Sequence, residues 1–90
     1  MITIRLWKLS TFPLMNKRSK SDEVYLKKLG MRIKSIRKEK GITQVALAYA
    51  CEIEKQNMSR IEVGNTNPNI LLLRKVCSHL DITLAELFDF

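Results

Sequence analysis

Four polar side chains between residues 55 and 60 have the types and spacing of a surface that could read DNA bases. They follow the pattern i, i+1, i+4 and i+5 and are Lys55, Gln56, Ser59 and Arg60. On a helix, this spacing places all four on one outward face. In the major groove glutamine suits a bidentate contact to adenine, and lysine or arginine suits O6 and N7 of guanine. We therefore predict that these residues contact base edges; the alternative is a solvated helix face.

A second group of polar residues fits contacts to the DNA backbone. Gln44 begins a preceding short helix, where its side chain and the free backbone N–H groups can hold a phosphate. The further phosphate candidates are Asn57, Asn65 and Thr66. Such contacts would set the position of the protein on DNA and the salt dependence of binding, and not the choice of sequence.

The residue pattern gives no support to catalysis or metal binding. The single histidine, His79, has no metal-ligand partner near it in sequence, and we expect it to be a partly buried structural residue. Cys51 and Cys77 are not a close-spaced metal pair and fall at apolar helix positions, which predicts buried free thiols. We therefore expect no enzyme activity, no metal and no cofactor, and a reducing, cytoplasmic setting.

The elements that position these residues are predicted to be helices. Leu26, Leu29, Ile33 and Ile36 recur every three or four residues and form one apolar stripe. Ser21 is the expected N-cap of this first helix, which ends near residue 41.

Each of the other four predicted helices follows a residue that can cap it. These residues are Thr43 before 44–51, Glu54 before 55–62, Asn69 before the apolar stripe 70–80, and Thr83 before 84–88. Glu86 also gives Thr83 the spacing of a capping box. Five helices with short loops predict a compact all-α domain over residues 21–90.

Charge is distributed unevenly along the 90 residues. The net charge is +7, and residues 1–40 hold twelve of the 16 basic residues but three of the nine acidic ones. This asymmetry predicts a polyanionic partner, nucleic acid before membrane. No stretch is long enough to span a membrane.

Residues 1–20 form a basic extension with no acidic residue. Three interpretations remain open for it. It is a flexible, dispensable segment, with Met15 as an alternative start; or an added strand or partner-binding segment that uses Trp7 and Phe12; or a basic arm that reaches DNA.

The segment 43–64, TQVALAYACEIEKQNMSRIEVG, resembles the helix-turn-helix of the lambda-repressor-like (Xre) family of DNA-binding regulators. The matching residues are Gln44, Leu47-Ala48, Ile53, Met58, Ile61-Glu62 and Gly64, and the resemblance extends from about Leu26 to the C-terminus. It implies a five-helix lambda-repressor-like domain that binds double-stranded DNA, with Lys55, Gln56, Ser59 and Arg60 at the base-reading positions. The domain ends in a fifth helix with the segment 67–88, NPNILLLRKVCSHLDITLAELF, and in this it resembles the restriction–modification controller proteins and short phage-type repressors of the family.

The resemblance also implies contacts inside the domain. In the family an arginine of the first helix bridges a glutamate that ends the third, and Arg37 and Glu62 match this structural ion pair. A glutamine at the position of Gln44 holds a phosphate and braces the recognition helix. The chain departs from the family at Glu52, where glycine is usual; a positive φ there would cost a glutamate about 1 kcal/mol.

The C-terminal end is unusually apolar for a small domain. Leu84, Leu87, Phe88 and Phe90 are predicted to form a homodimer surface, because exposed apolar patches mark partners. A two-fold dimer would present two recognition helices to a near-palindromic operator. The expected function is therefore a homodimeric transcriptional repressor or autoregulator.

Two alternatives to this function stay open. One is an antitoxin that binds a toxin protein and represses its own operon. The other is a protein-interaction domain without DNA binding, for which Glu52 and Glu54 are the main evidence, since they place negative charge near the proposed DNA face.

Overall fold

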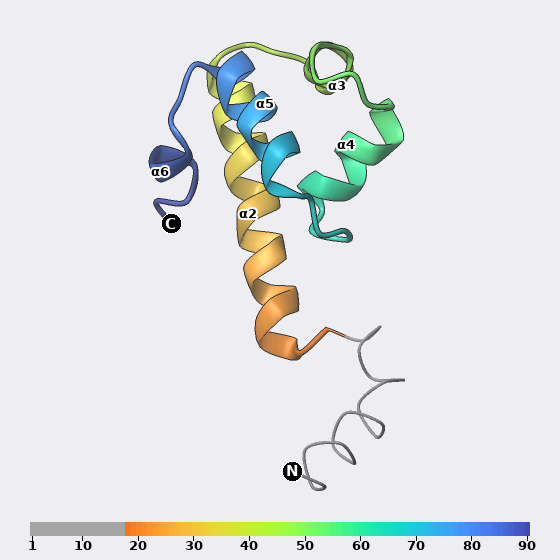
Figure 1. Cartoon of the computed structure of the whole chain (residues 1–90), viewed down its shortest axis with the longest axis vertical. Coiled ribbons are helices and arrows are strands. Elements are labelled where there is room, and N and C mark those ends of the chain that lie inside the picture. Colours follow the sequence, from red (N-terminus) through yellow and green to blue (C-terminus); the bar gives the residue numbers. More distant parts are fainter. Residues whose placement is uncertain (1–17) are drawn as a thin grey trace, which may run out of the picture.

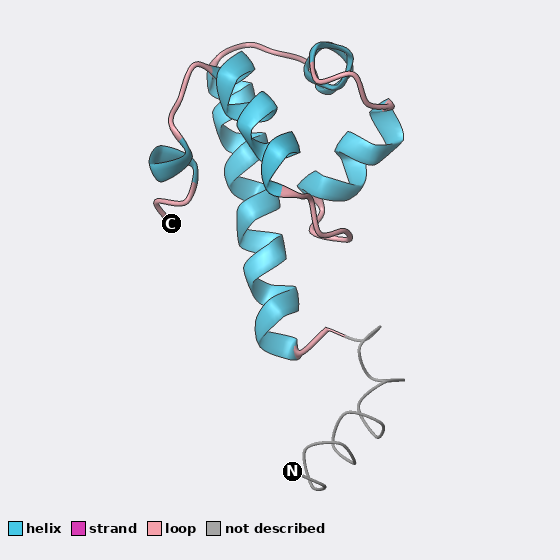
Figure 2. Ribbon diagram, in the orientation of Figure 1, coloured by secondary structure: helices cyan, strands magenta, loops and turns pink. Residues whose placement is uncertain are grey.

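The computed structural model describes residues 18–90, which fold into five helices without a strand (Figures 1 and 2). The helices are α2 (Lys20–Glu39), α3 (Gln44–Ala50), α4 (Lys55–Glu62), α5 (Ile70–Leu80) and α6 (Leu84–Leu87). The predicted all-α fold is confirmed. The interpretations of the N-terminal extension that concern residues 1–17 lie outside the described residues.

Helix starts agree with the predicted caps at three places and differ at two. The side chains of Thr43, Asn69 and Thr83 accept hydrogen bonds from backbone N–H groups of the helices they precede, and Thr83 forms the full capping box. Ser21 is not the cap of α2: Ser19 Oγ accepts the N–H of Asp22 at 3.0 Å, so the helix begins two residues earlier.

Glu54 is the second difference. It occupies the N-cap position of α4 with an extended backbone, but its side chain makes no capping hydrogen bond. The predicted start of α4 is therefore right, while the predicted capping contact is wrong.

The long helix α2 is the support against which the other helices pack. In Figure 1 it runs vertically, with α6 on one side and α3 and α4 on the other. Apolar residues from all five helices form one core, whose fully buried members include Ile33, Leu47, Met58, Leu80 and Leu87. The core thereby fixes the α3–α4 pair on α2.

α2 and the C-terminal end of α4 approach each other closely at Gly30. A Cβ on Gly30 would collide with the backbone carbonyl oxygens of Ile61 and Glu62 and would lie 2.7 Å from the carbonyl carbon of Glu62. Gly64 follows α4 with φ +79°, and a Cβ there would lie 2.6 Å from the Cα of Lys27. Both contacts need glycine, because any side chain would push α4 away from α2.

Two predicted side-chain environments are wrong. Leu87, expected on a dimer surface, is 0% exposed and belongs to the core of its own chain, because α6 turns its apolar face inward. His79 was expected to be partly buried but is exposed, because Val76, Cys77 and Leu80 fill the inner face of α5.

The C-terminal segment is attached to α2 by polar and aromatic contacts. Arg32 Nη2 donates a hydrogen bond to the backbone oxygen of Glu86 at 2.8 Å. The ring of Tyr25 lies 6.4 Å from that of Phe88 and 5.3 Å from that of Phe90, measured between centroids. These contacts leave Tyr25 and Phe90 about half exposed.

Candidate nucleic-acid interface

The exposed face of α4 is the candidate interface, and the packing of the helix determines which side chains it presents. Met58 and Ile61 are buried against the core. On the other side, Lys55, Gln56 and Arg60 are exposed. Ser59 is partly buried, so it lies nearer to the core than the other three predicted base-reading residues.

The turn between α3 and α4 has the left-handed geometry that the family usually gives to glycine. Glu52 has φ +61°, and the N–H of Ile53 returns to the carbonyl oxygen of Ala48 at 3.0 Å. Ala48 of α3 is 2% exposed and belongs to the core. The Glu52 carboxylate lies 3.5 Å from Lys75 Nζ on α5, in an exposed ion pair.

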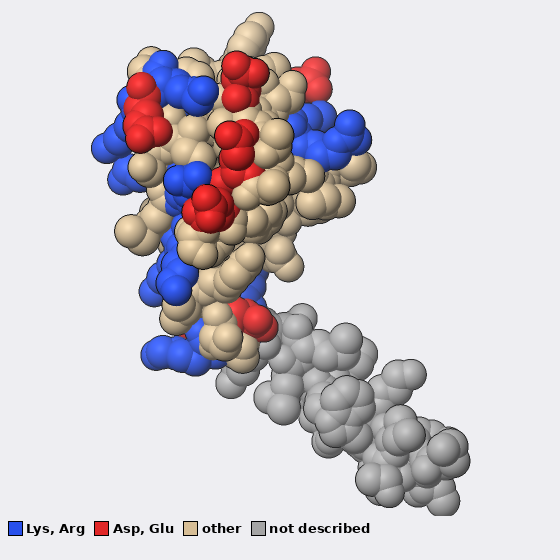
Figure 3. Space-filling view, turned by 90° about the vertical axis from the view of Figure 1, so that its left-hand side faces the viewer, with Lys and Arg blue, Asp and Glu red and all other residues tan. Residues whose placement is uncertain are grey.

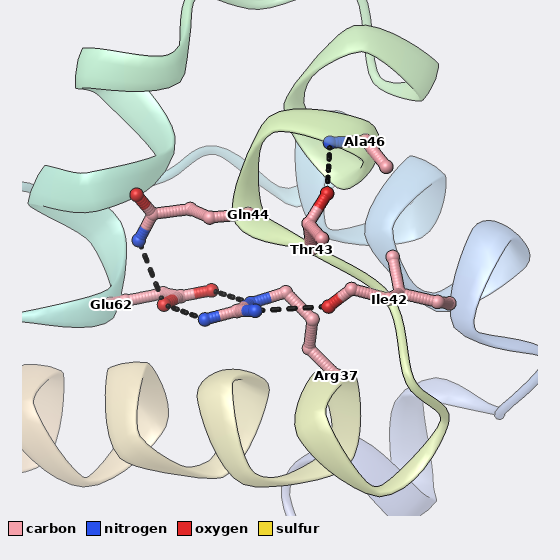
Figure 4. A network of polar contacts seen from close by, with 6 residues as sticks. All are labelled: Arg37, Ile42, Thr43, Gln44, Ala46 and Glu62. Atoms are coloured by element: carbon pink, nitrogen blue, oxygen red, sulfur yellow. Dashed lines mark hydrogen bonds and ion pairs between the residues drawn. The ribbon is translucent and has the colours of Figure 1, made fainter.

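A buried polar network connects α2, α3 and α4 (Figure 4). Arg37 Nε and Nη2 donate to the two carboxylate oxygens of Glu62 at 2.6 and 2.9 Å, and its Nη1 donates to the backbone oxygen of Ile42 at 2.9 Å. Gln44 Nε2 donates to Glu62 Oε1 at 3.0 Å. The structure thus brings together the two residues of the expected ion pair. Gln44 bonds the glutamate that ends α4, as expected of a residue that braces this helix, and the Ile42 carbonyl is an additional member.

Burial makes this network a strong constraint on the geometry of the site. The side chains of Arg37 and Glu62 are 8% and 1% exposed. The hydrogen bonds to Glu62 raise the pKa of Arg37, against the opposing effect of burial. Bidentate arginine–carboxylate contacts fix direction as well as distance, so the network holds the end of α4 and the start of α3 at defined positions on α2.

The predicted phosphate residues lie on α3, on α4 and in the segment that follows α4. Gln44 is partly buried, and its amide nitrogen is engaged with Glu62 through one of its two hydrogens. Asn57 and Asn65 are exposed, whereas Thr66 is partly buried. The N–H of Asn65 donates to the backbone oxygen of Arg60 at 2.8 Å, which closes the end of α4 after Gly64.

The charge of the face that carries α6 differs from that of a surface expected to bind a polyanion, which would be continuously basic. Figure 3 shows Asp and Glu side chains interspersed with Lys and Arg side chains over this face. A mixed surface of this kind gives a polyanion no continuous attraction.

The cysteines, the potential metal ligands and the apolar helices of the described residues 18–90 bear on other kinds of function. Cys51 and Cys77 are buried free thiols, as predicted, and burial raises the pKa of both. Among the described residues, no group of three or more His, Cys, Asp or Glu could hold a metal ion. No described helix combines the length and the apolar character that crossing a membrane requires.

Sequence reasoning missed two residues that shape the site. The backbone oxygen of Ile42 takes the third arginine hydrogen bond, and no sequence pattern marks a carbonyl as an acceptor. Gly30 allows α4 to contact α2. A glycine beside Leu29 in the apolar stripe of a helix is a signal that could have revealed this contact.

Comparison with known proteins agrees with this geometry. The helix-turn-helix family HTH_3 matches residues 33–87. The HTH-type transcriptional regulator SinR of Bacillus subtilis is 42% identical over 62 residues, which cover 68% of this chain and 56% of SinR. The control protein C.MunI of Mycoplasma sp is 36% identical over 63 residues, which cover 69% of this chain and 85% of C.MunI. The chain spans about half the length of the Bacillus subtilis regulators that it matches.

A solved structure shows the same arrangement of helices. The restriction-modification controller protein C.AhdI from Aeromonas hydrophila is similar with a TM-score of 0.71 and 30% sequence identity, over 73% of this chain and 96% of that one. The family match covers more than half of the chain and contains α3, the turn and α4. The chain therefore belongs to the HTH_3, Xre-like helix-turn-helix family.

Proposed function

We propose that the protein is a sequence-specific DNA-binding transcriptional regulator that acts as a repressor or autoregulator in the cytoplasm. The observation that carries this proposal is the exposed face of α4, where Lys55, Gln56 and Arg60 project from a helix that a buried ion pair fixes in place. Rigid presentation matters because base readout requires hydrogen-bonding groups at defined positions. Membership of the HTH_3 family supports the same function.

The side chains divide into two roles in this proposal. Base edges in the major groove are read by Lys55, Gln56, Ser59 and Arg60. Of these four residues, the partly buried Ser59 lies nearest to the core of the domain. The phosphate contacts come from Gln44, Asn57, Asn65 and Thr66. Gln44 connects the two roles, because the amide that would approach a phosphate also bonds the glutamate that ends α4.

The proposal includes a homodimer that binds a near-palindromic operator. Leu84 and Phe88 are partly buried and Phe90 is 47% exposed, so they leave apolar surface for a second copy. Leu87 is excluded from this surface because the core of its own chain covers it. No contact of the described residues favours the antitoxin alternative over this arrangement.

Selection of DNA from a random pool, followed by a salt titration of the selected sequence, tests the proposal. We expect a palindromic consensus that two chains bind. Weak binding without sequence preference would contradict the proposal and favour a protein partner instead.

A substitution of Gln56 tests the base-reading face directly. Gln56→Ala should weaken binding to the selected sequence by about 5- to 150-fold, since a bidentate base contact contributes about 1–3 kcal/mol to discrimination. Its affinity for random DNA should stay unchanged, and its unfolding temperature should match the wild type because the side chain is exposed. An equal loss of affinity for the selected sequence and for random DNA would show that Gln56 does not read bases.

A further inference from the structure

Glu54 is the acidic side chain of the α3–α4 unit that the fold leaves free. It stands at the N-cap position of α4 and is exposed, yet it makes no capping hydrogen bond with its own helix. The other acids of this unit are engaged: Glu62 is buried with Arg37, and Glu52 pairs with Lys75. No hydrogen bond or ion pair connects the Glu54 side chain to any residue in the range 18–90.

The surroundings of Glu54 leave space for a ligand group. Glu54 lines an open hollow of about 570 Å³ at the helix-turn-helix turn, together with Tyr49, Ala50, Glu52 and Ile53. Tyr49, Ala50 and Ile53 contribute apolar surface to this hollow, and the two glutamates contribute polar surface. Glu52 contacts Lys75 in an exposed ion pair, whereas no described residue engages the Glu54 carboxylate.

A free carboxylate on a DNA-binding face is unfavourable unless it meets a donor. It repels the phosphates, and it has no hydrogen to donate. The major groove offers one base edge that suits it, since the N4 amino group of cytosine donates to glutamate or aspartate. Glu54 is next to Lys55 and Gln56, so it enters the groove at the same end of α4.

We propose that Glu54 is a specificity-determining residue that accepts a hydrogen bond from the N4 amino group of a cytosine in the operator. This inference rests on the proposed DNA-binding function and deepens it. The acidic residue thereby has a role at the interface, although its charge alone favours a domain that does not bind DNA. Cytosine discrimination and charge repulsion make different predictions, so an experiment can separate them.

The test selects DNA from a random pool with three proteins: the wild type, Glu54→Ala and the matched control Glu52→Ala. The two substitutions remove the same carboxylate from nearby positions, and both side chains are exposed, so both variants should fold. We expect a cytosine in the wild-type consensus at a position beside the Lys55 and Gln56 contacts. Glu54→Ala should reduce the preference for that cytosine by about 5- to 150-fold, because alanine offers no acceptor, while Glu52→Ala should retain it.

Two results would overturn the inference in distinguishable ways. If Glu54→Ala keeps the cytosine and binds all sequences more tightly by the same factor, Glu54 acts through repulsion alone, and the proposed function stands. If the wild type selects no consensus, the proposed function fails together with the inference.

Discussion

Replacing Glu62 with alanine should remove much of the stability of the domain. The change takes away the acceptor of Arg37 Nε, Arg37 Nη2 and Gln44 Nε2, and it leaves the Arg37 charge in a site that is 8% exposed with one remaining bond, to Ile42. Breaking a buried ion pair on one side typically costs about 3–5 kcal/mol. Domains of this kind have a total unfolding free energy of about 5–15 kcal/mol, so Glu62→Ala should be marginally stable.

The corresponding shift in unfolding temperature is large. A loss of 1 kcal/mol lowers Tm by about 4–8 °C in a domain of 60–100 residues, so the expected decrease is about 12–40 °C. Thermal unfolding followed by circular dichroism measures this decrease. Urea unfolding of Glu62→Ala, Arg37→Ala and the double variant then gives the coupling energy of the pair. The double variant should be more stable than the sum of the two losses predicts.

The exposed pair Lys75–Glu52 is the control for this reasoning. Its side chains are 53% and 80% exposed and 3.5 Å apart, so Lys75→Ala should cost at most about 1 kcal/mol. If Glu62→Ala cost no more than Lys75→Ala, the buried network would not fix α4 on α2, and the argument for a rigid recognition face would fail.

Two substitutions test the backbone geometry around the interface. Gly30→Ala should destabilise the domain by about 1–3 kcal/mol, because its Cβ would meet the backbone at the end of α4. Gly41→Ala is the control, since Gly41 has φ +71° and no atom within 4 Å of its Cβ position. The control reports the cost of backbone strain without a steric clash. An unchanged urea midpoint for Gly30→Ala would show that α4 does not contact α2 there. Glu52→Gly should stabilise the domain by up to about 1 kcal/mol, since glycine adopts φ +61° without the strain of a side chain. Lys75→Ala removes the same ion pair without changing the turn, so it is the reference for this variant. If the urea midpoint of Glu52→Gly were lower than that of Lys75→Ala, the Glu52 side chain would contribute more stability to the turn than relaxed backbone geometry does.

The sequence by itself determined the helices and the identity of the outward face of α4. Capping residues such as Thr43, Asn69 and Thr83 act within three residues along the chain, and apolar periodicity acts within one turn, so both are visible without tertiary structure. Ser19 and Ser21 both precede acidic first-turn residues, and local pattern could not choose between them. The expected face of Lys55, Gln56 and Arg60 followed from spacing alone.

Tertiary structure decided which polar groups are engaged and which are free. Arg37 and Glu62 are 25 residues apart, and Arg32 and Glu86 are 54 apart, so packing alone brings them together. Packing also buries Leu87, which the apolar character of the C-terminal end predicts on a dimer surface. It left the Glu54 carboxylate without a partner in the described part of the chain, although the sequence predicted a cap. Local signals specify conformation over a few residues, whereas burial and pairing depend on contacts between distant segments.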